Sequence, residues 1–304
     1  MAVYTHLSSA QISAYIAPFS LGDLVDFKGI SGGIENTNYF VTTQLKGQPQ
    51  QDFVLTLFED LSYDEMPYFV DLTEHLVAHN VTVPAPFRDK DGRALSLLAN
   101  KPALLFPRFA GDHLARSEIG VSQCAVMGRE LARLHVAGQE FAKVRHSHRG
   151  QKWWSELGPR AAKCIDGEGA TMLMMAIGQY DAMVAQQPDL PMGVVHGDLF
   201  HDNALFNQGQ LSATIDVYNA SNDYLLFDVA VTVNDWCIAP DGSISPRLYD
   251  SFLQAYAEVR AFNPAEQQYW NAMLVAAAMR FWLSRLETYH GLDAHQREDG
   301  VTVL

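Results

Sequence analysis

The chain has 304 residues, of which 48% are hydrophobic and 18% charged, a globular composition that excludes a disordered or low-complexity protein. Its 35 acidic and 21 basic residues give a formal net charge of −14, which argues against a general binder of nucleic acid or of anionic membranes. Three scattered cysteines, no basic leader and no long apolar run predict a cytoplasmic protein without a membrane span.

The first third of the chain is predicted to form a short helix, a small antiparallel sheet, a second helix and a further hairpin. Ser8 and Gln11 have the spacing of a capping box, which predicts where the first helix begins. The predicted ranges are 26–43 and 52–59 for the sheet, 66–77 for the second helix, and 94–98 and 103–108 for the hairpin.

The remainder is predicted to be mostly helical, with short strands and loops over 193–217. Asn263 as N-cap, Pro264 at the first helical position and Glu266 at the third predict the start of the last helix. The predicted helices are 126–136, 171–186, 246–260 and 264–289. This order predicts an α+β protein with a sheet-rich lobe over 1–108, a helical lobe over 109–304, and a ligand cleft between them.

Functional residue types are densest in VVHGDLFHDNALF, residues 194–206. Asp198 and Asn203 are five residues apart, and Asp216 follows at the predicted end of the second strand of a hairpin. Phosphoryl transfer from ATP needs a carboxylate that accepts the proton of the attacking hydroxyl, and an amide and a second carboxylate that hold Mg²⁺. An isolated His-x-Asp would indicate only a turn, but the full spacing favours Asp198 as the catalytic residue and Asn203 and Asp216 as metal ligands.

These motifs resemble those of the aminoglycoside phosphotransferase and choline kinase superfamily, which has a two-lobed, protein-kinase-like fold. HGDLFHDN and IDVY carry the resemblance, with LARLH at 131–135 and DYLLFDVA at 223–230, where it implies that Asp228 supports the catalytic loop. Within the superfamily, GISGGIENTNYFV, VLTLFE and YNASNDYLLFDVAVTVNDWC are similar to bacterial homoserine kinases. The resemblance implies ATP and Mg²⁺ as cofactors, L-homoserine as substrate and a role in threonine biosynthesis.

The expected ATP site has two parts. Glycine-rich residues that let backbone N–H groups approach the phosphates are expected at Ser31, Gly32 and Gly33. Phe106 and Phe109 bound the expected hinge, whose backbone would contact the adenine. One residue departs from the superfamily pattern: Thr56 stands where the third strand usually carries a lysine that contacts the phosphates.

Homoserine is a zwitterion, so its pocket requires an acid for the ammonium and a base for the carboxylate. The candidates are Asp223 and Asp235 for the first, and Arg280 and Arg285 for the second. His196 is expected to form a hydrogen bond within the catalytic loop. Residues 145–149, with two arginines and two histidines, are predicted to be a solvated loop from which Arg149 could reach the substrate.

Two other functions remain open at this level. The first is a kinase of another small alcohol, such as an aminoglycoside, choline, methylthioribose or an amino sugar. The second is a non-catalytic, pseudokinase-like binding protein, for which Thr56 is the only support. The complete set of Asp198, Asn203 and Asp216 argues against this second alternative, because a non-catalytic chain has no chemical need for all three.

Overall fold

A computed structural model describes residues 4–31 and 35–292 of the chain. The chain divides into two compact units, each drawn from three segments. The first unit comprises Met1–Glu118, Val136–Lys143 and His201–Tyr218, and the second comprises Ile119–His135, Val144–Phe200 and Asn219–Leu304. The lobe boundary at residue 108 stays a prediction.

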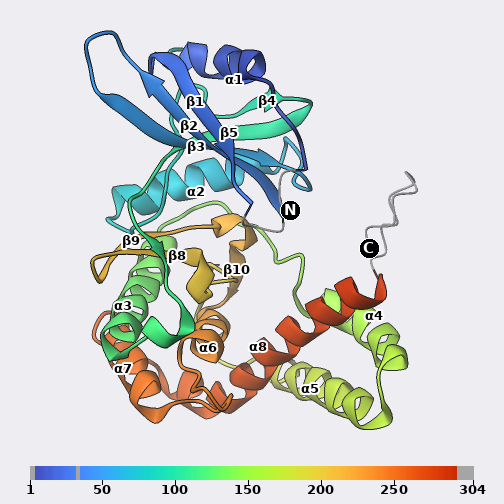
Figure 1. The fold of residues 1–304 in the computed structure, drawn as a ribbon. Helices are drawn as coiled ribbons and strands as arrows, with labels where there is room; N and C mark the ends of the chain where they lie inside the picture. The colour runs from blue at the N-terminus through green and yellow to red at the C-terminus, as the bar shows by residue number, and fades with distance from the viewer. Residues whose placement is uncertain (1–3, 32–34, 293–304) are drawn as a thin grey trace. The chain divides into compact units, whose positions relative to one another are not determined.

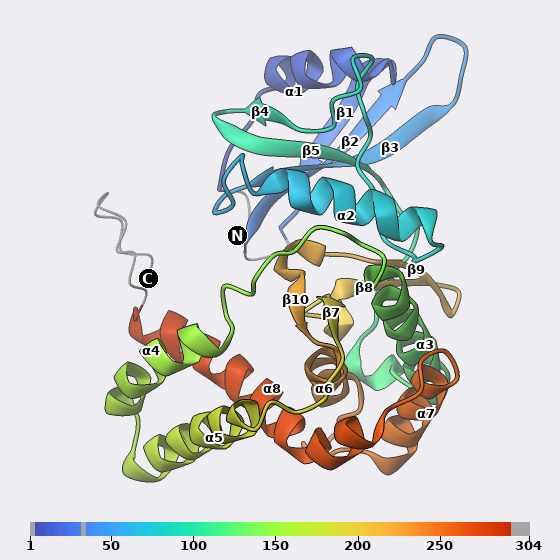
Figure 2. The ribbon, with the colours of Figure 1, turned by 180° about the vertical axis from the view of Figure 1, so that it is seen from behind.

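The first unit is built on a five-stranded antiparallel sheet with the strand order β1-β2-β3-β5-β4 (Figure 1). Helix α1 lies on one face of this sheet and helix α2 on the other, as Figure 2 shows from behind. The elements are α1 (Ser9–Ile16), β1 (Asp23–Gly29), β2 (Asn36–Gln44), β3 (Gln50–Phe58), α2 (Met66–Ala78), β4 (Ser96–Leu98) and β5 (Lys101–Pro107).

The predicted elements of this region are confirmed, and the reasons are local. Ser8 and Gln11 form the expected capping box at α1. Every second residue of β2 from Thr37 to Thr43 is buried, because one face of the strand packs on the core while the other is partly solvated. Tyr39, for example, is 4% exposed and packs in one cluster with Ile12 of α1.

The first unit also contains a small antiparallel sheet with the order β6-β8-β9. Its strands are β6 (Asp112–His113), β8 (Ala204–Asn207) and β9 (Gln210–Thr214). The hairpin is tied to the chain after α2, because the backbone N–H of Thr214 donates to the carbonyl of Thr82 at 2.7 Å. The ring of Tyr218 packs edge-on against Phe58 and Phe69, which fixes the segment after β9.

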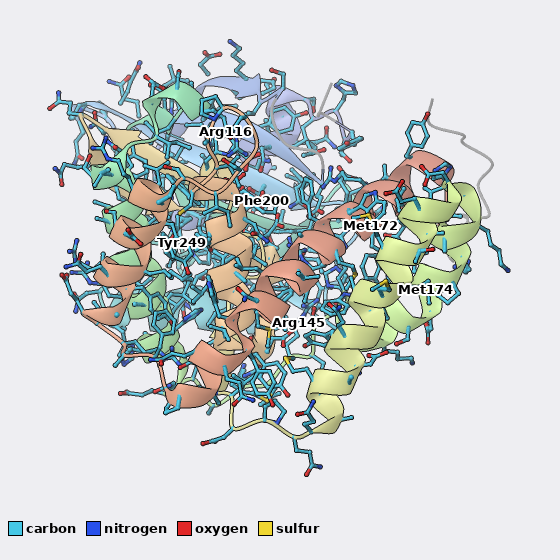
Figure 3. The ribbon with its side chains drawn as sticks, turned by 90° about the horizontal axis from the view of Figure 1, so that it is seen from below. Arg116, Arg145, Met172, Met174, Phe200 and Tyr249 are labelled. Carbon is cyan, nitrogen blue, oxygen red and sulfur yellow. The ribbon has the colours of Figure 1, made fainter. Side chains whose placement is uncertain are left out.

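The second unit is helical apart from a two-stranded antiparallel sheet of β7 and β10. Helices α4 and α5 pack against α8, with Met172 and Met174 of α5 exposed (Figure 3). The elements are α3 (Val121–Gly138), whose residues from 136 onward belong to the first unit, α4 (Gln151–Ala161), α5 (Gly167–Ala185), β7 (Met192–Val195), β10 (Ser221–Tyr224), α6 (Leu225–Trp236), α7 (Pro246–Ala257) and α8 (Pro264–His290).

The start of α8 is confirmed: Asn263 and Glu266 form a capping box, with Pro264 at the first helical position. Helices α4 and α6 are not predicted from the sequence. Almost every residue of α6 is buried, so its apolar residues show no 3.6-residue period. Helix α4 contains Pro159, a residue that normally argues against a helix interior. None of the helices described is both long and apolar enough to cross a membrane.

Candidate active site

The His-Gly-Asp loop follows strand β7 and depends on a glycine at its centre. Gly197 has φ of +80°, a conformation that side chains rarely adopt. A Cβ atom there would lie 3.0 Å from the carbonyl oxygen of Asn219, closer than ordinary contact. His196 is fully buried, and its Nδ1 accepts a hydrogen bond from the backbone N–H of Asp198 at 3.3 Å. The loop therefore turns Asp198 out of the core while His196 stays inside.

Asp228, on helix α6, lies beneath this loop and is fully buried. Its carboxylate accepts the backbone N–H groups of His196 at 2.6 Å and Gly197 at 2.8 Å. It also pairs with Nε2 of the buried His135, at 3.1 Å. Burial alone would raise the pKa of Asp228, but these hydrogen bonds hold the pKa below its ordinary value. An ionised carboxylate thus accepts two successive N–H groups of the loop.

Asp198 is the partly exposed acid of the loop, with 26% of its side chain accessible. One carboxylate oxygen accepts a hydrogen bond from Nη2 of Arg280 on α8 at 3.2 Å. The Arg280 side chain is 7% exposed, and its Nε has no hydrogen-bond partner among the residues that the structure describes. A buried donor without a partner is costly, so the guanidinium of Arg280 has hydrogen-bonding capacity that its protein neighbours leave unused.

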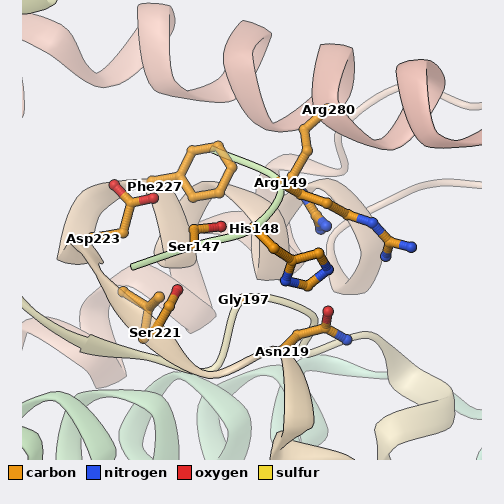
Figure 4. A pocket seen from close by; sticks show the side chains of 10 residues that line it. Ser147, His148, Arg149, Gly197, Asn219, Ser221, Asp223, Phe227 and Arg280 are labelled. Atoms are coloured by element: carbon orange, nitrogen blue, oxygen red, sulfur yellow. The ribbon is translucent and has the colours of Figure 1, made fainter. Parts of the chain in front are cut away.

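Arg280 and Asp223 line one polar pocket within the second unit (Figure 4). In the view of Figure 4, Arg280 reaches down from α8 while Asp223 lies on the far side of the Phe227 ring. Burial raises the pKa of Asp223 to about 6. The lining residues are Ser147, His148, Arg149, Val195, Gly197, Asn219, Ser221, Asp223, Phe227 and Arg280.

The other two substrate candidates lie elsewhere. Asp235 is 8% exposed in α6 and is not among the lining residues. Arg285 is exposed, and its guanidinium lies 4.9 Å from the centre of the Phe281 ring. Of the four residues that the sequence suggests, the structure therefore brings only Asp223 and Arg280 into the pocket.

The segment before α4 forms one wall of the pocket, which is more than the solvated loop expected from the sequence. The backbone N–H of Arg145 donates to the side chain of Asn222 at 2.9 Å, and the backbone N–H of Asn222 donates to the carbonyl of Arg145 at 2.7 Å. This exchange fixes the segment to β10 and brings Ser147, His148 and Arg149 to the pocket. The sequence suggested that Arg149 could reach the substrate, and the structure places it in the pocket wall; no periodicity or motif marks Ser147 or His148, which only the tertiary contact reveals.

Asn203 and Asp216 flank one end of the β8–β9 hairpin in the first unit. Asn203 ends a short 3₁₀ helix, is 9% exposed, and accepts the backbone N–H of Ile215 through its carbonyl at 2.9 Å. Asp216 is predicted to end the second strand of the hairpin, but β9 ends at Thr214, so Asp216 lies two residues beyond it. Its φ of +65° is a left-handed conformation, uncommon for a residue other than glycine and often associated with function.

The donor set of Asn203 and Asp216 suits Mg²⁺. Both offer hard oxygen ligands, and Mg²⁺ is commonly held by one or two such side chains together with substrate phosphates and water. Over the part of the chain that the structure describes, no group of three or more His, Cys, Asp or Glu side chains forms a metal cage. A metal shared with a nucleotide therefore fits these residues better than a structural ion does.

The expected ATP-binding residues are described in part. Ser31 is exposed after β1, while Gly32 and Gly33 lie outside the described residues. Phe106 is buried in β5, and Phe109 is half-buried just after that strand. Thr56 is 5% exposed and donates its hydroxyl to the side chain of Asn38, directly opposite in β2, at 2.7 Å. The position of the usual lysine is therefore occupied by a hydroxyl that is satisfied within the sheet.

The chain belongs to the phosphotransferase enzyme family, whose model matches residues 26–262. Among curated relatives, it is 39% identical to homoserine kinase of Burkholderia pseudomallei (strain 1710b) over 301 residues, which cover 95% of this chain and 89% of the relative. It is also 39% identical to homoserine kinase of Pseudomonas aeruginosa (strain LESB58) over 296 residues, with 96% and 92% covered. The resemblance seen in the sequence motifs is confirmed.

Solved structures show the same fold. The amicoumacin kinase hAmiN, in complex with AMP-PNP, Ca²⁺ and Ami, matches with a TM-score of 0.74 at 13% identity, covering 95% of this chain and 89% of that one. An aminoglycoside phosphotransferase from Alicyclobacillus acidocaldarius matches with a TM-score of 0.67 at 13% identity, covering 96% and 88%. The predicted α+β, protein-kinase-like fold is confirmed by these neighbours.

Proposed function

We propose that this protein is an ATP-dependent homoserine kinase, which phosphorylates the terminal hydroxyl of L-homoserine to O-phospho-L-homoserine. Two homoserine kinases of known name are 39% identical to it over nearly its whole length. The product implies a step in threonine biosynthesis, in the cytoplasm, with small molecules as the reaction partners. Neither a nucleic acid nor a membrane is part of the proposal.

The observation that carries the proposal is that an acidic and a basic side chain line the same pocket, together with Gly197 of the loop that presents Asp198. Asp223 offers a carboxylate to the ammonium of an amino acid, and Arg280 offers a guanidinium to its carboxylate. Arg280 also donates to Asp198 through Nη2, so an amino acid held by the guanidinium of Arg280 would lie near the proposed catalytic carboxylate. An uncharged alcohol would leave the carboxylate of Asp223 without a cationic partner from the substrate, which is unfavourable in a partly buried site.

The chemical step follows from these roles. Asp198 orients the terminal hydroxyl and accepts its proton, the hydroxyl oxygen bonds to the γ-phosphorus, and the bond from that phosphorus to the bridging oxygen breaks to release ADP. A positioned base of this kind contributes about 10²–10⁴-fold to the rate. Asn203 and Asp216 would hold Mg²⁺, which neutralises charge on the phosphates. Ser31, Gly32 and Gly33 would approach the phosphates, and the backbone at Phe106 and Phe109 the adenine.

The decisive experiment follows ADP release and product mass with Mg-ATP and L-homoserine. The expected result is one O-phosphohomoserine for each ADP. Two analogues separate the charges: aminopropanol lacks the carboxylate, and hydroxybutanoate lacks the ammonium. Arg280→Met should depress kcat/KM more for homoserine than for aminopropanol, because both acceptors lose the hydrogen bond from Arg280 to Asp198 but only homoserine also loses the partner of its carboxylate. Asp223→Asn should depress kcat/KM for homoserine but not for hydroxybutanoate. Arg285→Met and Asp235→Asn provide the comparison with charges outside the pocket.

Two outcomes would reject the proposal. Phosphorylation of an aminoglycoside, choline, methylthioribose or an amino sugar with higher kcat/KM than homoserine would favour another alcohol kinase. Mg²⁺-dependent ATP binding without transfer to any hydroxyl would favour the pseudokinase alternative, for which the threonine at position 56 is the motivation.

A further inference from the structure

A row of buried polar side chains connects the first turn of α8 with the His-Gly-Asp loop, all within the second unit. Glu266, Tyr256, His135 and Asp228 are at most 1% exposed, and the Arg260 side chain is 9% exposed. The successive links are Glu266 Oε1 to Arg260 Nη2 (2.8 Å), Arg260 Nη1 to Tyr256 Oη (3.1 Å), Tyr256 Oη to His135 Nδ1 (2.6 Å) and His135 Nε2 to Asp228 Oδ2 (3.1 Å).

The chemistry of the two ends determines which atom carries each proton. A guanidinium can only donate, so the Tyr256 oxygen accepts from Arg260 and its own O–H is left to donate to Nδ1 of His135. With Nδ1 as acceptor, the single proton of a neutral imidazole lies on Nε2. That proton is donated to Asp228, whose carboxylate also accepts the N–H groups of His196 and Gly197. Every link is then a donor facing an acceptor.

The protonation of the ring agrees with this order. Burial holds the pKa of His135 below its ordinary value, and the nearby Arg260 acts in the same direction, whereas Asp228 and Glu266 oppose it. A neutral ring has one donor and one acceptor nitrogen, and both are used. Glu266 has a second task, because its other oxygen accepts the backbone N–H of Asn263 at 2.8 Å and so closes the α8 cap.

We propose that Tyr256, Arg260 and Glu266 are positioning residues for phosphoryl transfer, because they hold His135 as its Nε2–H tautomer and thereby hold Asp228 against the loop that presents Asp198. The assignment of Asp198 as the base rests on the proposed function. The three residues lie outside the motifs that define the site, and none lines the substrate pocket. Their effect is therefore expected in kcat and not in the binding of homoserine.

The test is Tyr256→Phe, which keeps the ring and removes only the hydroxyl. We expect kcat to fall by about 10-fold, as when an outer partner of an oriented histidine is lost. KM for ATP and homoserine should stay unchanged. The matched control is Tyr249→Phe on the same helix, whose hydroxyl accepts from Trp270 at 2.7 Å outside this row and whose activity should stay at the wild-type level.

A second readout separates positioning from general loss of stability. In ¹⁵N NMR spectra of wild-type protein, His135 should show an unprotonated, hydrogen-bonded Nδ1 and a protonated Nε2. In Tyr256→Phe, the Nδ1 signal should move toward that of a free acceptor nitrogen. Arg260→Lys keeps the positive charge but lacks the two separately directed N–H groups that contact Glu266 and Tyr256, so its kcat should lie between those of wild type and Arg260→Met.

Three results would overturn the proposal: a wild-type His135 protonated on Nδ1, a kcat of Tyr256→Phe equal to that of Tyr249→Phe, or a fall that resides only in KM. The NMR result does not depend on which alcohol is the substrate. If wild-type protein transfers no phosphoryl group to homoserine, the substrate assignment fails while the tautomer of His135 is still decided.

Discussion

Asp223 occupies an unfavourable position in the unliganded protein. Burial raises its pKa to about 6, so at neutral pH the side chain carries a charge that its surroundings solvate poorly. The hydrogen bond from the backbone N–H of Tyr224 and the charge of Arg280 lower this pKa and Asp228 raises it, and burial still has the largest effect. A ligand ammonium beside Asp223 would relieve this penalty. A residue that is unfavourable alone and favourable with its ligand is expected at a binding site.

The pH dependence of substrate use follows from this residue. Binding of the ammonium requires ionised Asp223, so kcat/KM for homoserine should fall below about pH 6 and approach a tenfold loss per pH unit. The profile is measured with saturating Mg-ATP. Asp223→Asn should have a low kcat/KM that lacks this limb. If kcat/KM of the variant still falls below about pH 6, the fall belongs to the titration of another group.

The free energy of unfolding should fall with rising pH, whereas kcat/KM rises. The folded pKa of Asp223 lies above its unfolded value, so the folded state binds the proton more tightly and loses stability as pH rises from about 4 to 6. Above that window, wild type is penalised by up to about 3 kcal/mol, the equivalent of two pKa units. Asp223→Asn, always neutral, should therefore melt several degrees higher at about pH 8. Most of the difference should vanish near pH 4, and a variant less stable at both values would contradict the argument.

The catalytic assignment is tested by Asp198→Asn, which keeps the shape and removes the proton acceptor. We expect turnover to fall by at least about 10²–10⁴-fold. ATP binding, measured by calorimetry, should remain within a few-fold of wild type, because the proposed role of Asp198 is toward the alcohol and not the nucleotide. Turnover like that of wild type would exclude Asp198 as the base.

At the scale of elements, sequence signals were sufficient where a local rule decides the structure. Capping boxes at Ser8 and Asn263 mark two helix starts, and the β-prone residues within 26–43 mark the hairpin that contains β2. Helix α6 could not be predicted in this way, because burial on all sides erases the amphipathic period. The end of β9 was placed two residues too late, since β-prone residues continue past Thr214 while the backbone turns into a left-handed conformation at Asp216.

The cap of α8 should contribute measurably, because α8 is the longest helix described and carries Arg280. Asn263→Ala removes the side-chain oxygen that accepts the N–H of Glu266 at 2.8 Å. The expected loss is about 1 kcal/mol of unfolding free energy, measured by urea denaturation. The side-chain amide of Asn263 also donates to the carbonyl of Asp189, and a serine hydroxyl is too short to replace that hydrogen bond. Asn263→Ser therefore isolates the cap and should recover most of the stability.

At the scale of the whole molecule, the sequence predicts those residues of the candidate site that lie close together along the chain, and not those that the fold brings together. The spacing of Asp198, Asn203 and Asp216 indicates phosphoryl transfer before any coordinate is known. The wall formed by Ser147, His148 and Arg149 has no such spacing, because an exchange of hydrogen bonds with β10 creates it. The same holds for the row from Glu266 to His135, whose members come from three helices and the segment between two of them.

The net charge of −14 opposes the approach of a polyanionic nucleotide at long range, so we expect a cation to favour ATP binding. We expect Mg-ATP to raise the melting temperature, with a stabilisation of about 2.7 kcal/mol at a ligand concentration of 100 times Kd. Removing Mg²⁺ with EDTA should abolish most of this shift and all turnover. In Asp216→Asn and Asn203→Ala, the Mg²⁺-dependent part of the shift should be reduced. Asp202→Asn, at the neighbour of Asn203, is the control because it removes the same charge as Asp216→Asn. An equal loss of the Mg²⁺-dependent shift in Asp202→Asn would show that local charge, and not ligation by Asn203 and Asp216, governs the response.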